Sequence, residues 1–333
     1  MSALRQHATG MSRYALAVFC AVFCVGLAPM AAAQQDYPAK PVRILVGFLP
    51  GGTADSSARL ASQILGDRFR QSFIVDNRTG ANGLVAIQVV LASPGDGYNL
   101  LMATTGALTI SPVAEKNIPY NPLTSFRTIA LVGAFPYAIA ARNDLPVNNL
   151  RGLIEYSKSN PGKLFFGSAG TYSVNQLGIE WLKVLTGLDA QHVPFKGGSG
   201  ALSEVLAGRI DFTLASLGGA MPLIAAGKIK GLAVTSPNRT SLAEGLPTAV
   251  ESGVPKFIVQ PWVGLVGPAS LVQPVVVRLN EVINEALKVP ANQAALAKQG
   301  MYPFTDTPEG FQRLIAQELA TWADIVKRLP AEN

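Results

Sequence analysis

The sequence has few of the side chains that catalyse reactions or bind metals. Its only cysteines are Cys20 and Cys24, and its only histidines are His7 and His192. Residues 34–333 therefore offer no disulfide framework, no thiolate nucleophile and no histidine pair for zinc. Asp and Glu residues do not cluster at the spacing of calcium or magnesium ligands. We expect neither a metal nor a cofactor.

Three catalytic or nucleotide-binding motifs are also missing. The chain contains no G-x-G-x-x-G, no P-loop ending in Gly-Lys-Ser/Thr, and no Gly-x-Ser-x-Gly elbow. A Ser-His-Asp hydrolase would need His192 as its only base, and a lone histidine before Val-Pro is more often structural, with a ring nitrogen bonded to a backbone group. We therefore expect that the protein is not an enzyme.

One long apolar run occurs, from Tyr14 to Met30. It follows Arg5 and Arg13 and precedes the small residues Ala31–Ala33. This pattern predicts a signal peptide (residues 1–33) that is cleaved after Ala33, and hence a periplasmic protein. The run ends short of the roughly 20 residues that a membrane span needs, and no later segment is long and apolar enough.

Loss of the signal would remove two arginines and no acidic residue, so the formal net charge would fall from +6 to +4. The remaining basic residues are scattered along the chain. Scattered charge argues against a nucleic-acid partner and is compatible with the capture of small anions. The alternative is an ordinary solvated surface of mixed charge.

The stretch from Ile44 to Leu60 organises the first half of the chain. Val42–Phe48 is apolar and predicts a buried strand, Pro50-Gly51-Gly52 predicts a turn, and the alanine spacing that follows predicts a helix. Thr53 or Asp55 is expected to cap this helix. Free backbone N–H groups at such a helix start suit a carboxylate or phosphate, although an ordinary turn between strand and helix is the alternative.

A second stretch repeats this arrangement. Leu164–Gly167 predicts a strand, the small and hydroxyl residues Ser168–Ser173 predict a loop, and a helix follows through Leu185. If the two helix starts face each other, they could hold the two ends of one anion.

Strands alternate with helices along the rest of the chain, which predicts mostly parallel sheets. Thr105 follows a strand at its carboxyl end, where such sheets bind ligands. Residues 107–128 and 216–219 are expected to be loops. Three C-terminal helices should pack on the first lobe, giving two crossings and a hinged clamp with Trp262 packed at the hinge.

Several motifs, in a fixed order, are similar to a known family: YPAKPVRILVGFLPGGTADSSAR, VDNRTGANG, SPGDGYNLLMAT, NPGKLFFGSAG, HVPFKGG, GKIKGLAVTSPNR and LPTAVESGVP. Over nearly the whole mature length, the chain resembles the extracytoplasmic solute-binding receptors of tripartite tricarboxylate transporters, called Bug receptors. The resemblance implies a two-lobed α/β periplasmic binding protein of type II (Venus flytrap), with two mixed, mostly parallel sheets and a central cleft.

The resemblance also implies boundaries and roles. Domain 1 would comprise residues 34–138 and 262–333, and domain 2 residues 139–261. A monomer would carry a small carboxylate to membrane transporter subunits. The ligand-binding residues implied by the family are Phe48, Gly51, Gly52, Thr53, Asp55, Ser168, Ala169, Gly170 and Thr171. We add Thr105, Tyr172, Lys196 and Ser216, of which Lys196 could attract a distal carboxylate or simply be solvated.

The chain departs from the family pattern at three places. Tyr172-Ser173 replaces Gly-Thr, Gln176 replaces a histidine, and Ala215 replaces an acid that could pair an ammonium group. The loss of that acid argues against an amine-bearing ligand such as an amino acid. Phe48 and Tyr172 offer flat apolar surface, which favours a di- or aromatic carboxylate such as terephthalate. A periplasmic sensor that reports its ligand to a signalling kinase is the alternative function.

Overall fold

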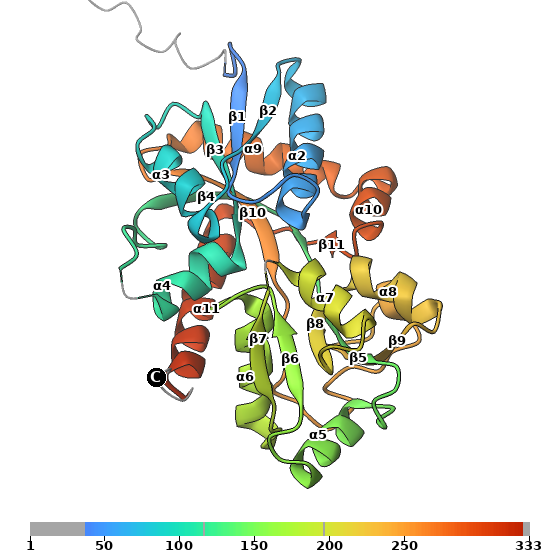
Figure 1. Cartoon of the computed structure of the whole chain (residues 1–333). Coiled ribbons are helices and arrows are strands. Elements are labelled where there is room, and N and C mark those ends of the chain that lie inside the picture. The colour runs from blue at the N-terminus through green and yellow to red at the C-terminus, as the bar shows by residue number, and fades with distance from the viewer. Residues whose placement is uncertain (1–36, 116, 196, 329–333) are drawn as a thin grey trace, which may run out of the picture. The chain divides into compact units, whose positions relative to one another are not determined.

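The computed structural model describes residues 37–115, 117–195 and 197–328, and Figure 1 shows the course of the chain. The chain divides into two units, Met1–Ala39 and the compact Lys40–Asn333. The expected signal peptide and its cleavage site lie outside the described residues. Within the described ranges, no helix combines the length and apolar character needed to cross a membrane.

The larger unit contains two mixed β-sheets. The first has six strands in the order β11-β4-β10-β3-β1-β2. They are β1 (Val42–Val46), β2 (Phe73–Asn77), β3 (Asn99–Thr104), β4 (Phe126–Ala134), β10 (Trp262–Pro268) and β11 (Tyr302–Pro303). β1 pairs in parallel with β2 and β3, whereas β10 lies antiparallel between β3 and β4.

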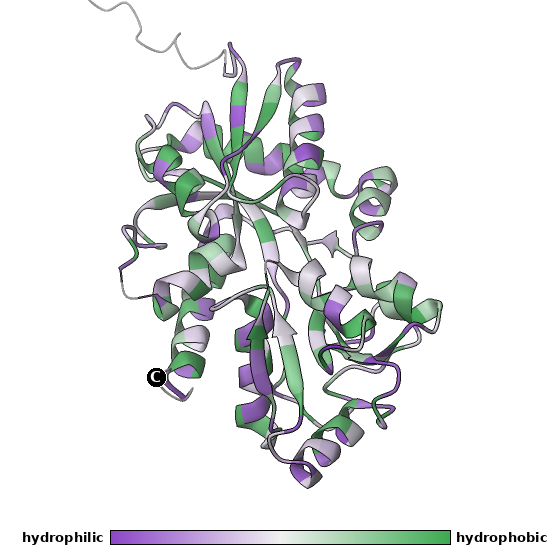
Figure 2. Ribbon diagram, viewed as in Figure 1, coloured by the Kyte–Doolittle hydropathy of each residue, from purple (hydrophilic) through white to green (hydrophobic). Residues whose placement is uncertain are grey.

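Helices cover this sheet because its strands are apolar on both faces. α3 and α11 share a hydrophobic core with it, while α2 and α9 pack on it and on each other. The helices are α2 (Thr53–Phe69), α3 (Leu84–Leu91), α9 (Gln273–Ala286), α10 (Pro290–Ala297) and α11 (Pro308–Arg328). In Figure 2, hydrophilic and hydrophobic residues alternate along α2, as expected of a helix with one buried face.

The second sheet has five strands in the order β7-β6-β8-β5-β9. They are β5 (Tyr137–Arg142), β6 (Phe165–Ser168), β7 (Gln191–Pro194), β8 (Phe212–Ser216) and β9 (Ile229–Val234). β6 is parallel to β7 and β8, and β5 is antiparallel to β8 and β9. One core contains α5 (Leu150–Ser159) and α6 (Val174–Thr186), and another contains α7 (Gly198–Leu206) and α8 (Leu217–Ala225). The predicted fold class, α/β with two mixed sheets, is confirmed. In each sheet most strands run in one direction, although five of the nine strand pairs among the described residues are antiparallel.

The chain crosses between the sheets at two adjacent places. β4 ends at Ala134 and β5 begins at Tyr137, so only Phe135 and Pro136 separate the sheets there. The return crossing leads into β10, and the Phe135 N–H donates to the Pro261 carbonyl at 2.9 Å, which joins the two crossings.

Strand directions show which strand ends lie at these crossings. β1 and β3 run parallel to β4, so their carboxyl ends lie at the edge from which the chain leaves the first sheet. β6, β8 and β9 run opposite to β5, so their carboxyl ends lie at the edge where the chain enters the second sheet. The loops after β1 and β6 therefore both lie at the strand ends that the crossings connect.

α11 contributes to the cores of both sheets. Phe311 and Ile315 near its start pack in the core of the first sheet. Trp322 and Ile325, near its end, pack in a core of the second sheet together with α6. The prediction that the C-terminal helices pack back on the first sheet thus holds for the start of α11 but misses its second half.

Two predicted loops are helical. Residues 106–114 form the π-helix η3 (Gly106–Ile110) and the short helix α4 (Ser111–Ala114), whose Pro112 occupies a first-turn position that tolerates proline. Residues 217–219 form the first turn of α8. Gly218 is there for close packing, because a Cβ on it would lie 2.8 Å from the Gln299 carbonyl oxygen. The remaining short elements are η2 (Ala81–Gly83) and η4 (Ser241–Ala243).

Candidate ligand-binding site

The first predicted loop, residues 47–52, connects β1 to α2. α2 begins at Thr53, and its N-cap is Gly52, which has no side-chain cap. The prediction that Thr53 or Asp55 caps the helix is therefore wrong. Gly51 has φ +84°, a left-handed conformation that favours glycine, and this conformation turns the chain sharply into the helix.

Asp55 holds this loop from inside the first turn of α2. Its carboxylate is only 2% exposed and accepts hydrogen bonds from the Gly51 N–H (3.0 Å), from Arg59 (2.8 Å) and from Asn77 Nδ2 (3.0 Å). Asn77 Nδ2 also donates to the Phe48 carbonyl at 3.0 Å. Burial on its own would raise the pKa of Asp55, but the hydrogen bonds from Arg59, Gly51 and Asn77 lower it. Asp55 is therefore an ionised side chain whose partners belong to the protein.

Four backbone donors at the start of α2 have no partner among the described residues. They are the N–H groups of Gly52, Thr53, Ala54 and Asp55, since the first helical bond runs from the Ser56 N–H to the Gly52 carbonyl at 2.9 Å. Gly52 is exposed and Thr53 is half-buried, whereas Ala54 and Asp55 are buried. The arrangement is the positive end of a helix with unsatisfied amides, which suits an anion.

A strained loop lies against the first one. Gly80, Ala81, Asn82 and Gly83 all have positive φ, although non-glycine residues rarely adopt this conformation. A Cβ on Gly47 would lie 2.4 Å from Gly83 Cα, so the two loops touch through glycine backbone. Strain of this kind concentrates at ligand sites. The sequence shows the glycines, but nothing in it reveals the left-handed Ala81.

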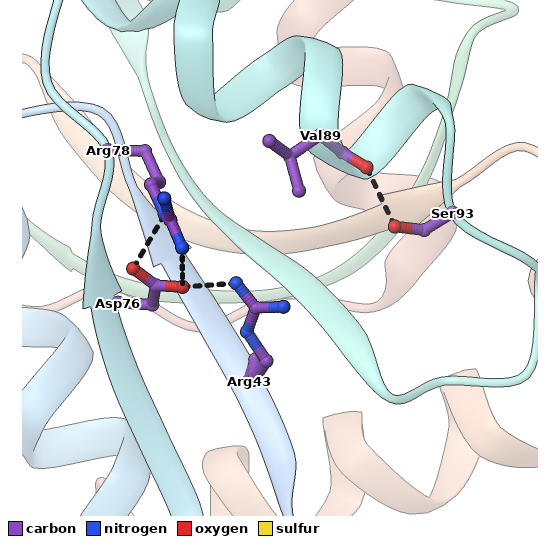
Figure 3. Close-up of polar contacts among 5 residues, drawn as sticks. All are labelled: Arg43, Asp76, Arg78, Val89 and Ser93. Carbon is purple, nitrogen blue, oxygen red and sulfur yellow. Dashed lines mark hydrogen bonds and ion pairs between the residues drawn. The ribbon is translucent and has the colours of Figure 1, made fainter.

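Charged residues fix the strand that leads into this loop. Figure 3 shows Arg43 and Arg78 both directed at Asp76, and Arg78 Nε donates to Asp76 at 2.9 Å. Burial favours a raised pKa for Asp76, but the two arginines lower it. Two guanidinium groups against one carboxylate leave one unit of positive charge at this end of the sheet.

The second predicted loop, residues 168–173, connects β6 to α6. Ser168 is fully buried, and its Oγ contacts the Gly170 carbonyl (3.0 Å), the Gly170 N–H (3.1 Å) and His192 Nε2 (2.6 Å). The His192 ring also stacks on Phe166, with ring centroids 5.1 Å apart. The Ser168 hydroxyl therefore shapes the loop, and the exposed residue beside it is Thr171.

Two residues brace the turn into α6. Ser173 is the N-cap, and its side chain accepts from the Gln176 N–H at 3.3 Å. Gln176 in turn accepts from the Tyr172 N–H through Oε1 at 2.6 Å. Tyr172 has φ +57°, again left-handed. Ser-x-x-Gln is a sequence signal of a capping box, which locates the helix start, but in a capping box Gln176 would accept from the Ser173 N–H and not from that of Tyr172.

The remaining predicted site residues that the structure describes differ in how deeply they are buried. Thr105 is buried, and its Oγ1 accepts from the Trp262 N–H at 2.8 Å, which joins β3 to the start of β10. Ser216 is the half-buried N-cap of α8. Phe48, Thr53, Ala169, Gly170 and Tyr172 are half-buried. Lys196 lies outside the described residues.

A polar network that the sequence did not predict joins Thr105 to α11. Thr109 Oγ1 contacts the Thr105 carbonyl (2.8 Å) and Glu318 (3.0 Å), and Trp262 Nε1 donates to Glu318 at 2.9 Å. Burial raises the pKa of Glu318 to about 7, although the bonds from Trp262 and Thr109 lower it in part. Trp262 also packs edge-on against Phe311, with ring centroids 4.9 Å apart. Trp262 is thus a packed residue at the crossing, as predicted.

The described residues include no cluster of three His, Cys, Asp or Glu side chains that could hold a metal ion. A surface hollow of about 1690 Å³ lies between α2, α9 and residues 305–307. None of the predicted site residues lines this hollow.

Comparisons with known proteins show which family the chain is similar to. A family model described as the tripartite tricarboxylate transporter family receptor matches residues 57–330. BugT of Bordetella pertussis is 31% identical over 306 residues, which cover 92% of this chain and 93% of BugT.

Two solved structures are similar over most of the chain. R. palustris Rpa4515 with adipate has 32% identity and a TM-score of 0.81, covering 88% of this chain and 98% of Rpa4515. MatC (Rpa3494) from Rhodopseudomonas palustris with bound malate has 28% identity and a TM-score of 0.77, covering 87% of this chain and 99% of MatC. The chain therefore belongs to the tripartite tricarboxylate transporter family of receptors, of the Bug type, with the two-lobed fold of periplasmic binding proteins.

Proposed function

We propose that this receptor captures a small carboxylate in the periplasm, between two lobes, and delivers it to the membrane subunits of a tripartite tricarboxylate transporter. The observation that carries the proposal is the set of unpaired N–H groups at the start of α2, matched by the braced loop at the start of α6. Both lie at sheet edges that the chain crossings connect. Amides at helix starts bind carboxylates without covalent chemistry.

The relatives support the choice of ligand class. The structures of Rpa4515 and MatC contain adipate and malate, both dicarboxylates. In the present chain, the lobes would comprise residues 34–138 with 262–333, and residues 139–261. The ligand contacts would come from residues 48–55 and 168–172, with Thr105 and Ser216 nearby and with Lys196 attracting a distal carboxylate.

Within this class we favour an extended or aromatic dicarboxylate, of which terephthalate is an example. The support is the pair of half-buried rings, Phe48 before the first helix and Tyr172 before the second. Half-buried rings can stack on a flat ligand. An aliphatic dicarboxylate would need the backbone amides but no aromatic ring to stack on.

Thermal shift of the mature protein tests the proposal. Malate, adipate and terephthalate are titrated against sugars and cationic amines, and at least one carboxylate is expected to stabilise saturably, by about 2.7 kcal/mol at a hundredfold excess over Kd. Stabilisation by sugars or amines with none by the three carboxylates would refute it.

A pair of variants at one position then tests the amides. Thr53→Pro removes one free donor at a helix position that tolerates proline, and Gly52 already has the extended backbone that precedes proline (φ −79°, ψ 172°). Thr53→Ala keeps the donor and removes only the hydroxyl. We expect Thr53→Pro to weaken carboxylate binding by about 1.5–3 kcal/mol and Thr53→Ala by less. Equal affinities of Thr53→Pro and wild type would remove these amides from the site.

A further inference from the structure

The two candidate loops are braced in the same way by different side chains. In α2 and in α6, the third helical residue accepts a hydrogen bond from the N–H of the residue before the N-cap. These pairs are Asp55 with Gly51 (3.0 Å) and Gln176 with Tyr172 (2.6 Å). The two acceptors are buried, at 2% and 4% exposure. The two donors both have left-handed backbone, with φ +84° and +57°.

The left-handed backbone at the donor residue costs conformational free energy at Tyr172 but almost none at Gly51. A left-handed conformation is nearly free for glycine, but it costs a tyrosine on the order of 1 kcal/mol. The hydrogen bond to Gln176 offsets this cost, and it fixes the direction in which the Tyr172 ring leaves the loop. Gln176 therefore controls both the amides and the ring of the second loop.

The braces differ in charge. Asp55 is ionised, and Arg59, which compensates it, has a side chain that is 58% exposed. Gln176 is neutral, and the first turn of α6 contains no acidic residue. The negative charge of Asp55 in α2 is compensated by Arg59 four positions later, whereas the residue four positions after Gln176 in α6 is Glu180, so a negative charge at position 176 would not be compensated in this way.

We propose that Gln176 is a positioning residue of the carboxylate site: it holds the Tyr172 loop in its left-handed form, and its neutrality keeps an uncompensated negative charge away from a carboxylate that binds the α6 loop. This inference rests on the proposed function.

Two substitutions at Gln176 separate the hydrogen bond from the charge. Gln176→Glu keeps an acceptor of the same length and adds a negative charge, while Gln176→Leu removes the acceptor without adding charge. Gln63→Glu, on the exposed side of α2, is the matched control for the charge change. Affinity is measured by calorimetry for whichever of malate, adipate and terephthalate binds wild type most tightly. The ¹⁵N–¹H resonance of Tyr172 reports whether its hydrogen bond persists.

We expect Gln176→Glu to keep the Tyr172 amide shift and the unliganded melting temperature, yet to bind at least about tenfold more weakly. Gln176→Leu should lose the amide shift and also bind more weakly, and Gln63→Glu should bind like wild type. Wild-type affinity in Gln176→Glu with the amide shift preserved would overturn the charge argument. Wild-type affinity in Gln176→Leu would overturn the positioning role. If wild type binds none of the three carboxylates, the proposed function itself fails, and this inference fails with it.

Discussion

At the residue scale, two polar side chains of the candidate site form hydrogen bonds that hold their own loops in place. Ser168 and Asp55 are both buried, and each forms hydrogen bonds with several groups of the protein. A buried polar group that loses its partner costs more than the bond itself contributes. These side chains therefore act on ligand binding through the backbone that they hold in place.

Ser168→Ala tests this view of the second loop. The substitution leaves the Gly170 N–H and one nitrogen of His192 without their partner, so we expect stability to fall by about 1–3 kcal/mol and carboxylate affinity to fall by about 1–2 kcal/mol. Urea denaturation and calorimetry measure the two effects. Ser203→Ala removes an exposed hydroxyl that bonds the Ser199 carbonyl, and it should change stability by less than about 0.5 kcal/mol. Equal stability of the two variants would contradict this account.

At the element scale, the first turn of α8 and the end of α10 meet through glycine. Gly300 has φ +73°, and a Cβ on it would lie 2.5 Å from the Gly218 nitrogen. This contact joins a helix of the second sheet to the segment before β11 of the first. Glycine is needed here for packing as well as for conformation.

Gly300→Ala and Gly208→Ala separate these two requirements. Gly208 has nearly the same backbone, φ +72°, but nothing lies within 4 Å of its added Cβ. Gly208→Ala should therefore cost only the left-handed conformation, about 1 kcal/mol, while Gly300→Ala should cost about 1–3 kcal/mol more. Urea denaturation compares the two, and equal losses would show that the close approach of α8 does not constrain Gly300.

Glu318 makes α11 sensitive to pH. Its pKa in the folded protein is about 7, above its ordinary value near 4.5, because burial disfavours the charged form. The folded state thus binds a proton more tightly than the unfolded state. This contribution to stability is complete below pH 4.5 and is lost as the pH rises through 7.

Glu318→Gln should remove that pH dependence while keeping an acceptor for Trp262 Nε1. At pH 8 the variant should be more stable than wild type, by an amount on the order of 2 kcal/mol after allowance for partial exposure, and at pH 4.5 the difference should vanish or reverse. Urea denaturation at several pH values measures this, with Glu281→Gln on the exposed face of α9 as the control. Parallel pH profiles for wild type and Glu318→Gln would rule the effect out.

At the scale of the whole molecule, the sequence predicted the elements better than their connections. Hydrophobic periodicity located β1, β6 and α6 to within a few residues, because each is strongly apolar along at least one face. It missed the start of α8, since Gly218 and Gly219 there resemble a loop. The close contact that explains Gly218 comes from Gln299, far along the chain. The packing of the second half of α11 against a core of the second sheet was also not predicted.

The sequence predicted where the two candidate loops lie in the chain, but not the hydrogen bonds that hold them. Small residues after β1 and β6 identified both loops, because strand ends and helix starts have recognisable composition. The partners of Asp55, Ser168 and Glu318 were not predictable, since Asn77, His192 and Thr109 lie 22, 24 and 209 positions away in the sequence. Contacts between distant positions depend on the assembled fold.

The central claim is that two loops of opposite sheets bind one carboxylate through backbone amides. A crystal structure of the mature protein with its tightest carboxylate tests this most directly. The account predicts ligand oxygens within about 2.7–3.2 Å of N–H groups in both segments, 51–55 and 169–175. A ligand bound in the hollow between α2 and α9, or touching only one of the two segments, would contradict it.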